Sequence, residues 1–159
     1  MELRIISVGR LSDKAYRQKI DEYLRWIGAW ARITVVDGID EKISSRAKAT
    51  QEKEARRLEA QKVLSLVGGE EYLVVLDARG QQMTSEQMAA RVGRLLETGK
   101  KRVNFVVGGP SGLDSSVISR ADAVWALSSL TFPHQLAVLV LCEQLYRAFA
   151  IIRSHPYHK

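Results

Sequence analysis

The sequence of 159 residues has a single cysteine, Cys142, so no disulfide can form within the chain. A protein without internal disulfides fits a reducing compartment, and we expect a cytoplasmic location. Cys142 lies in an apolar stretch, where a thiol packs like a small hydrophobic side chain. Long apolar runs are also missing, because Glu143 and Arg147 interrupt the stretch that begins at Leu136 before it could span a membrane. The first residues lead directly into a strand pattern, so we expect no signal peptide.

Acidic residues are scarce relative to basic ones, with 18 Asp and Glu against 24 Lys and Arg. The net charge of +6 favours a polyanionic partner, RNA or DNA ahead of a membrane, although solubility alone explains it equally well. From Lys100 onward there are seven basic residues and three acids, so the last third carries most of this excess. The pair His155 and His158 has no further ligand at a suitable spacing, so we expect no metal site.

The length fits one domain, residues 1–159, with a sizeable core and an ordinary apolar share of 46%. Strand patterns alternate with helix patterns five times, which predicts an α/β domain with a mainly parallel sheet and helices on both faces. We expect strands at residues 3–8, 33–36, 72–76, 103–107 and 123–127, and helices at residues 13–28, 45–67, 84–98, 113–121 and 135–152.

Small or polar residues follow three of the predicted strands, at Leu76-Asp77, Gly108-Gly109 and Leu127-Ser128. Ligands of parallel sheets bind at the carboxyl ends of strands, so we expect these three ends to line one pocket. Residues 108–112 form a turn that lets backbone approach a ligand, but they match neither a dinucleotide fingerprint nor a Walker A motif. Residues 77–80 are expected to be a turn, in which Asp77 either bonds a ribose hydroxyl or only shapes the turn.

Residues 127–134 lead into the last predicted helix, with Pro133 in its first turn. Ser128, Ser129 and Thr131 are candidate caps of this helix, and its free N–H groups suit a polar ligand. His134 by itself is better explained as structural than as catalytic. The helix is apolar over much of its circumference, so it is buried within the fold or against another subunit.

The last seven residues combine two histidines, a tyrosine and two cations. Such a tail can stack on a base, hydrogen-bond it and pair with phosphate, although chain ends are commonly disordered.

Four segments, taken in this order and at these spacings, resemble the methyltransferase H family of large-subunit ribosomal RNA, which belongs to the SPOUT superfamily. They are VVGGPSG at residues 106–112, LSSLTFPHQL at 127–136, EQLYRAF at 143–149 and PYHK at 156–159. The resemblance covers the full length of the chain. It departs from the family pattern at Val138 and Ala150, where basic residues are usual.

The resemblance implies S-adenosylmethionine as methyl donor, bound in a C-terminal trefoil knot that sequence physics alone would not predict. It also implies methylation of N3 of a pseudouridine in 23S rRNA, by a homodimer packed partly through the last helix. A domain this small with so short a tail recognises little RNA alone, so we expect the acceptor to be the assembled ribosome. The cofactor contacts that it implies are Leu76, Gly108, Leu127, Ser128, Ser129, Leu130, Thr131 and Phe132.

The N3–H group of the acceptor must lose its proton, and the tail offers residues for this step. His155 or Tyr157 is expected to accept the proton or to stabilise the charged base. Arg153 and the cluster at residues 100–102 are expected to hold RNA phosphate. Two alternatives stay open at this point: a non-catalytic factor that binds ribosomes or RNA on the same fold, and an enzyme acting on a nucleotide-like small molecule.

Overall fold

The computed structural model describes residues 1–44 and 46–157. The elements follow in the order β1 (Glu2–Ser7), α1 (Lys14–Gly28), β2 (Arg32–Val36), α2 (Ala49–Leu66), β3 (Tyr72–Gln82), α3 (Ser85–Glu97), β4 (Arg102–Val107), α4 (Ser115–Arg120), β5 (Ala123–Ala126) and α5 (His134–Ile152). Every predicted strand and helix has its counterpart, which confirms the α/β class. Ser45, where the second helix was expected to begin, lies outside the described residues, and α2 begins at Ala49.

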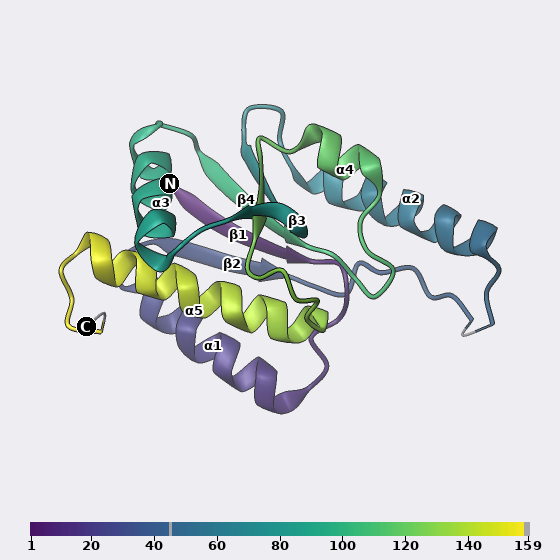
Figure 1. Cartoon of the computed structure of the whole chain (residues 1–159), viewed down its shortest axis with the longest axis horizontal. Helices are drawn as coiled ribbons and strands as arrows, with labels where there is room; N and C mark the ends of the chain where they lie inside the picture. The colour runs from purple at the N-terminus through teal and green to yellow at the C-terminus, as the bar shows by residue number, and fades with distance from the viewer. Residues whose placement is uncertain (45, 158–159) are drawn as a thin grey trace.

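The five strands form one parallel sheet in the order β2-β1-β4-β3-β5. Helices cover both of its faces, as Figure 1 shows. Side chains of α1, α3 and α5 pack with Ile5 and Phe105 on one face. Side chains of α2 and α4 pack with Ile6 and Val106 on the other. Neighbouring strand residues therefore serve opposite cores, because side chains alternate along a strand.

In the sequence, Thr84 and Gln87 have the spacing of a capping box and Asp114 is a possible cap before a short helix, and the structure confirms both caps. Thr84 accepts a hydrogen bond from the Gln87 amide at 3.2 Å while the Gln87 side chain accepts one from the Thr84 amide at 2.9 Å. Asp114 caps α4 by accepting from the Ser116 amide at 2.9 Å. The predicted cap of α5 is wrong: Pro133 occupies the cap position, and no side chain accepts a cap bond there.

The turn predicted at residues 77–80 is also wrong, because β3 continues through this segment to Gln82. The pairing of β3 with β5 shifts in register between Leu76 and Gln81, and both of these residues pair with Trp125. A Cβ atom on Gly80 would lie 2.8 Å from backbone atoms of Val124 and Trp125. The turn-forming residues therefore make an irregularity inside a strand, where glycine permits close backbone approach.

Helix α5 packs against α1 and α3 and forms the centre of one core. By length and composition it could cross a membrane, although Glu143 and Arg147 were expected to prevent this, and 44% of that stretch is buried inside the protein. Val138 and Ala150, the two departures from the family pattern, are fully buried, so a basic side chain would not fit at either position here. Cys142 is buried and free, as predicted.

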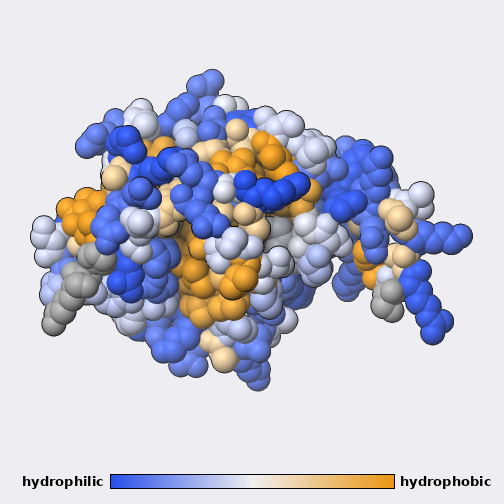
Figure 2. Space-filling view, viewed as in Figure 1, coloured by the Kyte–Doolittle hydropathy of each residue, from blue (hydrophilic) through white to orange (hydrophobic). Residues whose placement is uncertain are grey.

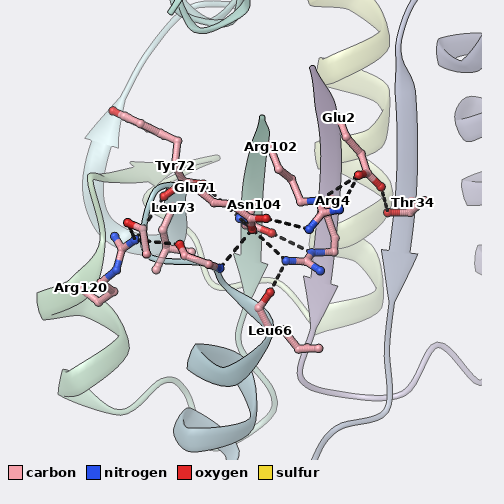
Figure 3. A network of polar contacts seen from close by, with 12 residues as sticks. Glu2, Arg4, Thr34, Leu66, Glu71, Tyr72, Leu73, Arg102, Asn104 and Arg120 are labelled. Carbon is pink, nitrogen blue, oxygen red and sulfur yellow. Dashed lines mark hydrogen bonds and ion pairs between the residues drawn. The ribbon is translucent and has the colours of Figure 1, made fainter. Parts of the chain in front are cut away.

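A polar network occupies the amino edge of the sheet, opposite the carboxyl ends of the strands (Figure 3). Glu71, just before β3, accepts hydrogen bonds from Arg102 at 2.8 Å, from Asn104 at 3.0 Å and from Arg4 at 3.1 Å. Arg102 also donates to Glu2, at 2.6 Å, and Arg4 also donates to Asn104, at 2.7 Å. The network joins the amino ends of β1, β3 and β4 through charge-assisted bonds.

Candidate active site

A cavity of about 690 Å³ opens at the carboxyl edge of the sheet. It lies where β3, β4 and β5 are followed by their loops, as predicted from the three strand ends in the sequence. Strand pairing explains the convergence, because Leu76 on β3 pairs with Val107 on one side and with Trp125 on the other. Seven of the eight expected cofactor contacts line this cavity, namely Leu76, Gly108, Leu127, Ser128, Leu130, Thr131 and Phe132. Ser129 is not among the lining residues.

The turn after β4 closes one wall of the cavity. The Gly112 amide donates to the Gly109 carbonyl at 3.0 Å, and Gly112 has a φ of +78°, which favours glycine. A Cβ atom on Gly108 would lie 3.0 Å from Cγ of Leu113, so the missing side chain lets Leu113 approach the backbone. Gly108 and Leu113 both line the cavity, and the turn therefore presents main chain as well as an apolar side chain to a ligand.

The loop between β5 and α5 forms the facing wall. Ser128 accepts a hydrogen bond from the Leu130 amide at 3.0 Å, so its hydroxyl shapes this loop and does not cap α5. Leu130 is 69% exposed at the cavity, an unusual position for a large apolar side chain. Such a residue suits a ligand that has an apolar part.

His134, the first residue of α5, lines the cavity although sequence reasoning assigned it no role there. Its Nε2 atom lies 2.9 Å from the Arg10 carbonyl oxygen. A carbonyl only accepts, so Nε2 donates the hydrogen in this contact. A Cβ atom on Gly9 would lie 2.6 Å from the imidazole ring, so glycine at the end of β1 makes room for it. Gly9, directly after the first predicted strand, is the feature of the sequence that could have indicated this contact.

Asp77 places a carboxylate on the cavity wall. Arg79 holds it with two bonds from its guanidinium, each 2.9 Å long, and its backbone amide adds a third at 2.8 Å. The hydrogen bond from the Arg79 side chain lowers the pKa of Asp77 the most, so the group is a carboxylate at neutral pH. The wall thus combines one fixed negative charge with backbone groups and apolar side chains, a composition typical of sites for organic ligands.

The tail residue Tyr157 packs against an aromatic ring of α5, and His155 packs against one in the segment that follows α1. The Tyr157 hydroxyl donates to Glu143 at 3.1 Å, and the Arg147 guanidinium lies 4.9 Å from the centre of the Tyr157 ring. Arg147 is itself ion-paired with Glu143 at 2.5 Å. Nδ1 of His155 accepts a bond from the Tyr157 amide at 3.3 Å, and its ring meets the edge of Trp30.

These contacts separate the two tail candidates chemically. Burial raises the pKa of Tyr157, and the neighbouring Tyr23 and Glu143 raise it further. The phenol therefore stays protonated at neutral pH and can donate a hydrogen bond but cannot accept a proton. The role of His155, the other expected proton acceptor, stays a prediction. Arg153 is exposed, and His158 and Lys159 lie outside the described residues.

The structure does not bring the tail to the cavity within one chain. His134 lines the cavity at one end of α5, whereas the tail follows the other end. A helix of 19 residues is about 28 Å long, at a rise of about 1.5 Å per residue. A tail that stays on the last turn of α5 is therefore a helix length from the cavity of its own chain, as Figure 1 shows.

The cluster at residues 100–102 does not lie beside the cavity either. It lies at the start of β4, at the amino edge of the sheet, and Arg102, the first residue of that strand, is ion-paired with Glu2 and Glu71. Its expected role in holding RNA phosphate at the site does not fit this position.

Comparison with known proteins gives consistent matches along the whole chain. The model of a family described as "Predicted SPOUT methyltransferase" matches residues 1–158. Three relatives carry the name ribosomal RNA large subunit methyltransferase H and align over 159 residues, which is all of both chains. They come from Syntrophomonas wolfei subsp. wolfei at 42% identity, Shouchella clausii at 39% and Lysinibacillus sphaericus at 38%.

Proposed function

The chain belongs to the SPOUT methyltransferase family, and from this premise we propose that it methylates N3 of a pseudouridine in 23S rRNA with S-adenosylmethionine. The observation that carries this function is the cavity where three parallel strand ends meet. Relatives named for methylation of large-subunit rRNA support the substrate class. The name of these relatives is that of an enzyme, which favours this function over a non-catalytic factor on the same fold.

The cavity fits S-adenosylmethionine in size and in chemistry. Cavities of roughly 300–1,000 Å³ accommodate ligands of this size, and this one measures about 690 Å³. Leu76, Leu113 and Leu127 offer apolar surface to an adenine ring, and the main chain at Gly108 offers hydrogen bonds. The Asp77 carboxylate, held by Arg79, suits a ribose hydroxyl. We assign the remaining contacts to Ser128, Leu130, Thr131 and Phe132, which line the same space, and to Ser129 in the same loop.

The bound cofactor supplies a methyl group on a positively charged sulfur, which a nitrogen atom can attack. The chain has to hold the base in line with that methyl group and take up the N3 proton. His155 is the residue that accepts this proton, and Tyr157, which stays protonated, exchanges its hydrogen bond to Glu143 for one to a carbonyl of the base. Arg153 contacts the phosphate of the same nucleotide.

Because the tail of one chain lies about a helix length from its own cavity, the tail that completes the site comes from a second copy. A half-buried apolar row on α5, formed by Leu136, Leu139 and Val140, provides the contact. These positions are three and four residues apart and so lie on one helix face. A two-fold dimer with antiparallel α5 helices places the end of one helix beside the start of the other. The active unit is therefore a homodimer.

The acceptor is presented by an assembled ribosomal particle in the cytoplasm. A chain of 159 residues folded around one sheet offers little surface for reading a long RNA sequence by itself, so the particle contributes the specificity. The trefoil knot implied by the family resemblance stays a prediction, as does the organisation of residues 1–159 as one domain.

Calorimetry with S-adenosylmethionine tests the cofactor assignment. We expect binding at micromolar affinity or tighter, which corresponds to about 8 kcal/mol. A crystal soaked in the cofactor should place it between Leu76, Gly108 and residues 127–132. Absence of binding, or binding elsewhere on the chain, would refute the assignment. Transfer of the methyl group to bare rRNA fragments as readily as to particles would refute the choice of substrate.

A further inference from the structure

Residues 46–57, here called the basic arm, form a second concentration of positive charge, apart from the residues that line the cavity. The arm contains five basic residues, Arg46, Lys48, Lys53, Arg56 and Arg57, against the two acids Glu52 and Glu54. This gives a net charge of +3, half of the +6 of the whole chain. It comprises the approach to α2 and the first half of that helix.

Besides Arg56, which donates to a backbone carbonyl, three of these cations have no carboxylate partner in the described part of the chain. Arg57 is bonded to Glu54 at 2.6 Å, whereas Arg46, Lys48 and Lys53 form no ion pair within residues 1–44 and 46–157. All three side chains are exposed. Exposed, unpaired cations in one short segment repel one another, and a polyanion bound to this surface reduces that repulsion.

The arm has few contacts of its own with the core. The first buried residue of α2 is Ala55, so the preceding turn of the helix has no residue in the core. In Figure 1 this half of α2 projects past the strand ends, on the side of the sheet where the cavity lies. Figure 2 shows a mostly hydrophilic surface at the same end of the molecule. The projection is therefore polar and accessible, as a surface that grips a nucleic acid backbone must be.

Arg56 connects the arm directly to the rim of the cavity. Its Nη1 atom donates to the Ser111 carbonyl at 3.2 Å, and the flanking residues Pro110 and Gly112 line the cavity. Asp114 follows the same turn. Its pKa is lowered chiefly by the Ser116 amide and further by the charges of Arg56 and Lys53, which places both cations close to it.

We propose that the basic arm binds backbone phosphates of the substrate RNA beside the methylated nucleotide and holds the RNA at the cavity mouth. This inference rests on the proposed rRNA substrate and adds the surface that receives it. Exposed Lys and Arg without aromatic neighbours fit phosphate contacts better than a protein interface, whose energetic centres are aromatic residues and Arg in buried pockets. The arm takes the role that the sequence suggested for residues 100–102.

The test compares two triple variants that each remove three positive charges. One is Arg46→Ala/Lys48→Ala/Lys53→Ala in the arm. The control, Arg94→Ala/Lys100→Ala/Lys101→Ala, lies at the end of α3 and before β4, at the opposite edge of the sheet. Binding to large-subunit particles is measured as a function of salt concentration, and S-adenosylmethionine affinity is measured in parallel.

We expect the arm variant to bind particles about tenfold more weakly or worse, with its salt slope reduced by about 2 to 3, since each lost phosphate contact removes about 0.7–0.9. The control variant should keep the wild-type slope, and cofactor affinity should be unchanged in both. A charge-conserving variant, Arg46→Lys/Lys48→Arg/Lys53→Arg, should bind particles like the wild type.

Equal salt slopes for the arm variant and the wild type would overturn the inference, as would equal losses in the arm variant and the control. A loss that occurs with particles but not with protein-free rRNA would indicate a ribosomal protein as the partner, which also overturns it. Failure of the wild-type chain to bind particles at all would instead refute the proposed substrate.

Discussion

Glu71→Gln tests whether the polar network at the amino edge of the sheet stabilises the fold. The Glu71 carboxylate is 12% exposed and accepts bonds from Arg102, Asn104 and Arg4 (Figure 3). Glutamine has the same shape, but it has no charge and offers one oxygen in place of two. Its amide NH₂ would face donors, so at least one charge-assisted bond is lost.

The expected cost is about 2 kcal/mol, since a hydrogen bond to a charged group contributes roughly 1.5–3 kcal/mol. A larger loss is not expected, because Arg102 keeps Glu2 and Arg4 keeps Asn104 as partners. For a chain of this length the loss corresponds to a melting temperature lower by about 4–8 °C. The assay is thermal unfolding followed by circular dichroism at pH 7.

The neighbouring substitution Glu70→Gln is the matched control. Glu70 is exposed, so its loss should change the free energy of unfolding by less than about 0.5 kcal/mol. Equal melting temperatures for the two variants would refute the assigned role of the network. Melting temperatures equal to that of the wild type in both variants would refute it as well.

The pH dependence follows from the same contacts. Burial alone raises the pKa of Glu71, but the hydrogen bonds from Asn104 and the Gly68 amide, with the charges of Arg102 and Arg4, outweigh it and lower the pKa. A lowered pKa in the folded state contributes stability that is present above the unfolded value, about 4.3, and is lost as the pH falls through the folded value. The gap between wild type and Glu71→Gln should therefore be constant near neutrality and shrink below about pH 4.

Three further predictions concern the site and the core. Gly108→Ala, whose Cβ atom would lie 3.0 Å from the Leu113 side chain, should weaken S-adenosylmethionine binding by about 1–2 kcal/mol, whereas Gly28→Ala, with nothing within 4 Å, should leave it unchanged in calorimetry. The double variant His155→Ala/Tyr157→Phe should bind the cofactor but lose methylation of ribosomal particles; full activity would remove the tail from the mechanism. Burial raises the pKa of Cys142 to about 12, so a thiol reagent at pH 8 should modify it only after unfolding, and rapid labelling of the folded chain would contradict its packing.

Much of the fold was readable from local patterns. Alternation of apolar strands with amphipathic helices predicted the parallel sheet, and the Thr84 and Gln87 spacing predicted a cap that the structure contains. The errors occur where several segments meet. Asp77 and Gly80 have the composition of a turn, but pairing with β5 draws them into a strand. Tertiary hydrogen bonds outweighed local turn preference there.

The candidate site was predicted in part for the same reason. The three strand ends follow from topology, because parallel strands put their carboxyl ends on one edge. His134 was missed, because its place depends on the space that Gly9 leaves at the end of a distant strand. The loop at residues 127–132 and Tyr157 lie at opposite ends of α5, so the length of this helix separates Tyr157 from the cavity. They were expected in one site because both belong to the last part of the chain.

The most direct test is nucleoside mass spectrometry of large-subunit rRNA after incubation of purified protein with particles and S-adenosylmethionine carrying an isotope-labelled methyl group. Particles from cells that lack this gene serve as the acceptor. We expect one new labelled nucleoside, a pseudouridine methylated at N3, and much less of it with Gly108→Ala. A labelled product on another base, or no product from a protein that binds the cofactor, would contradict it.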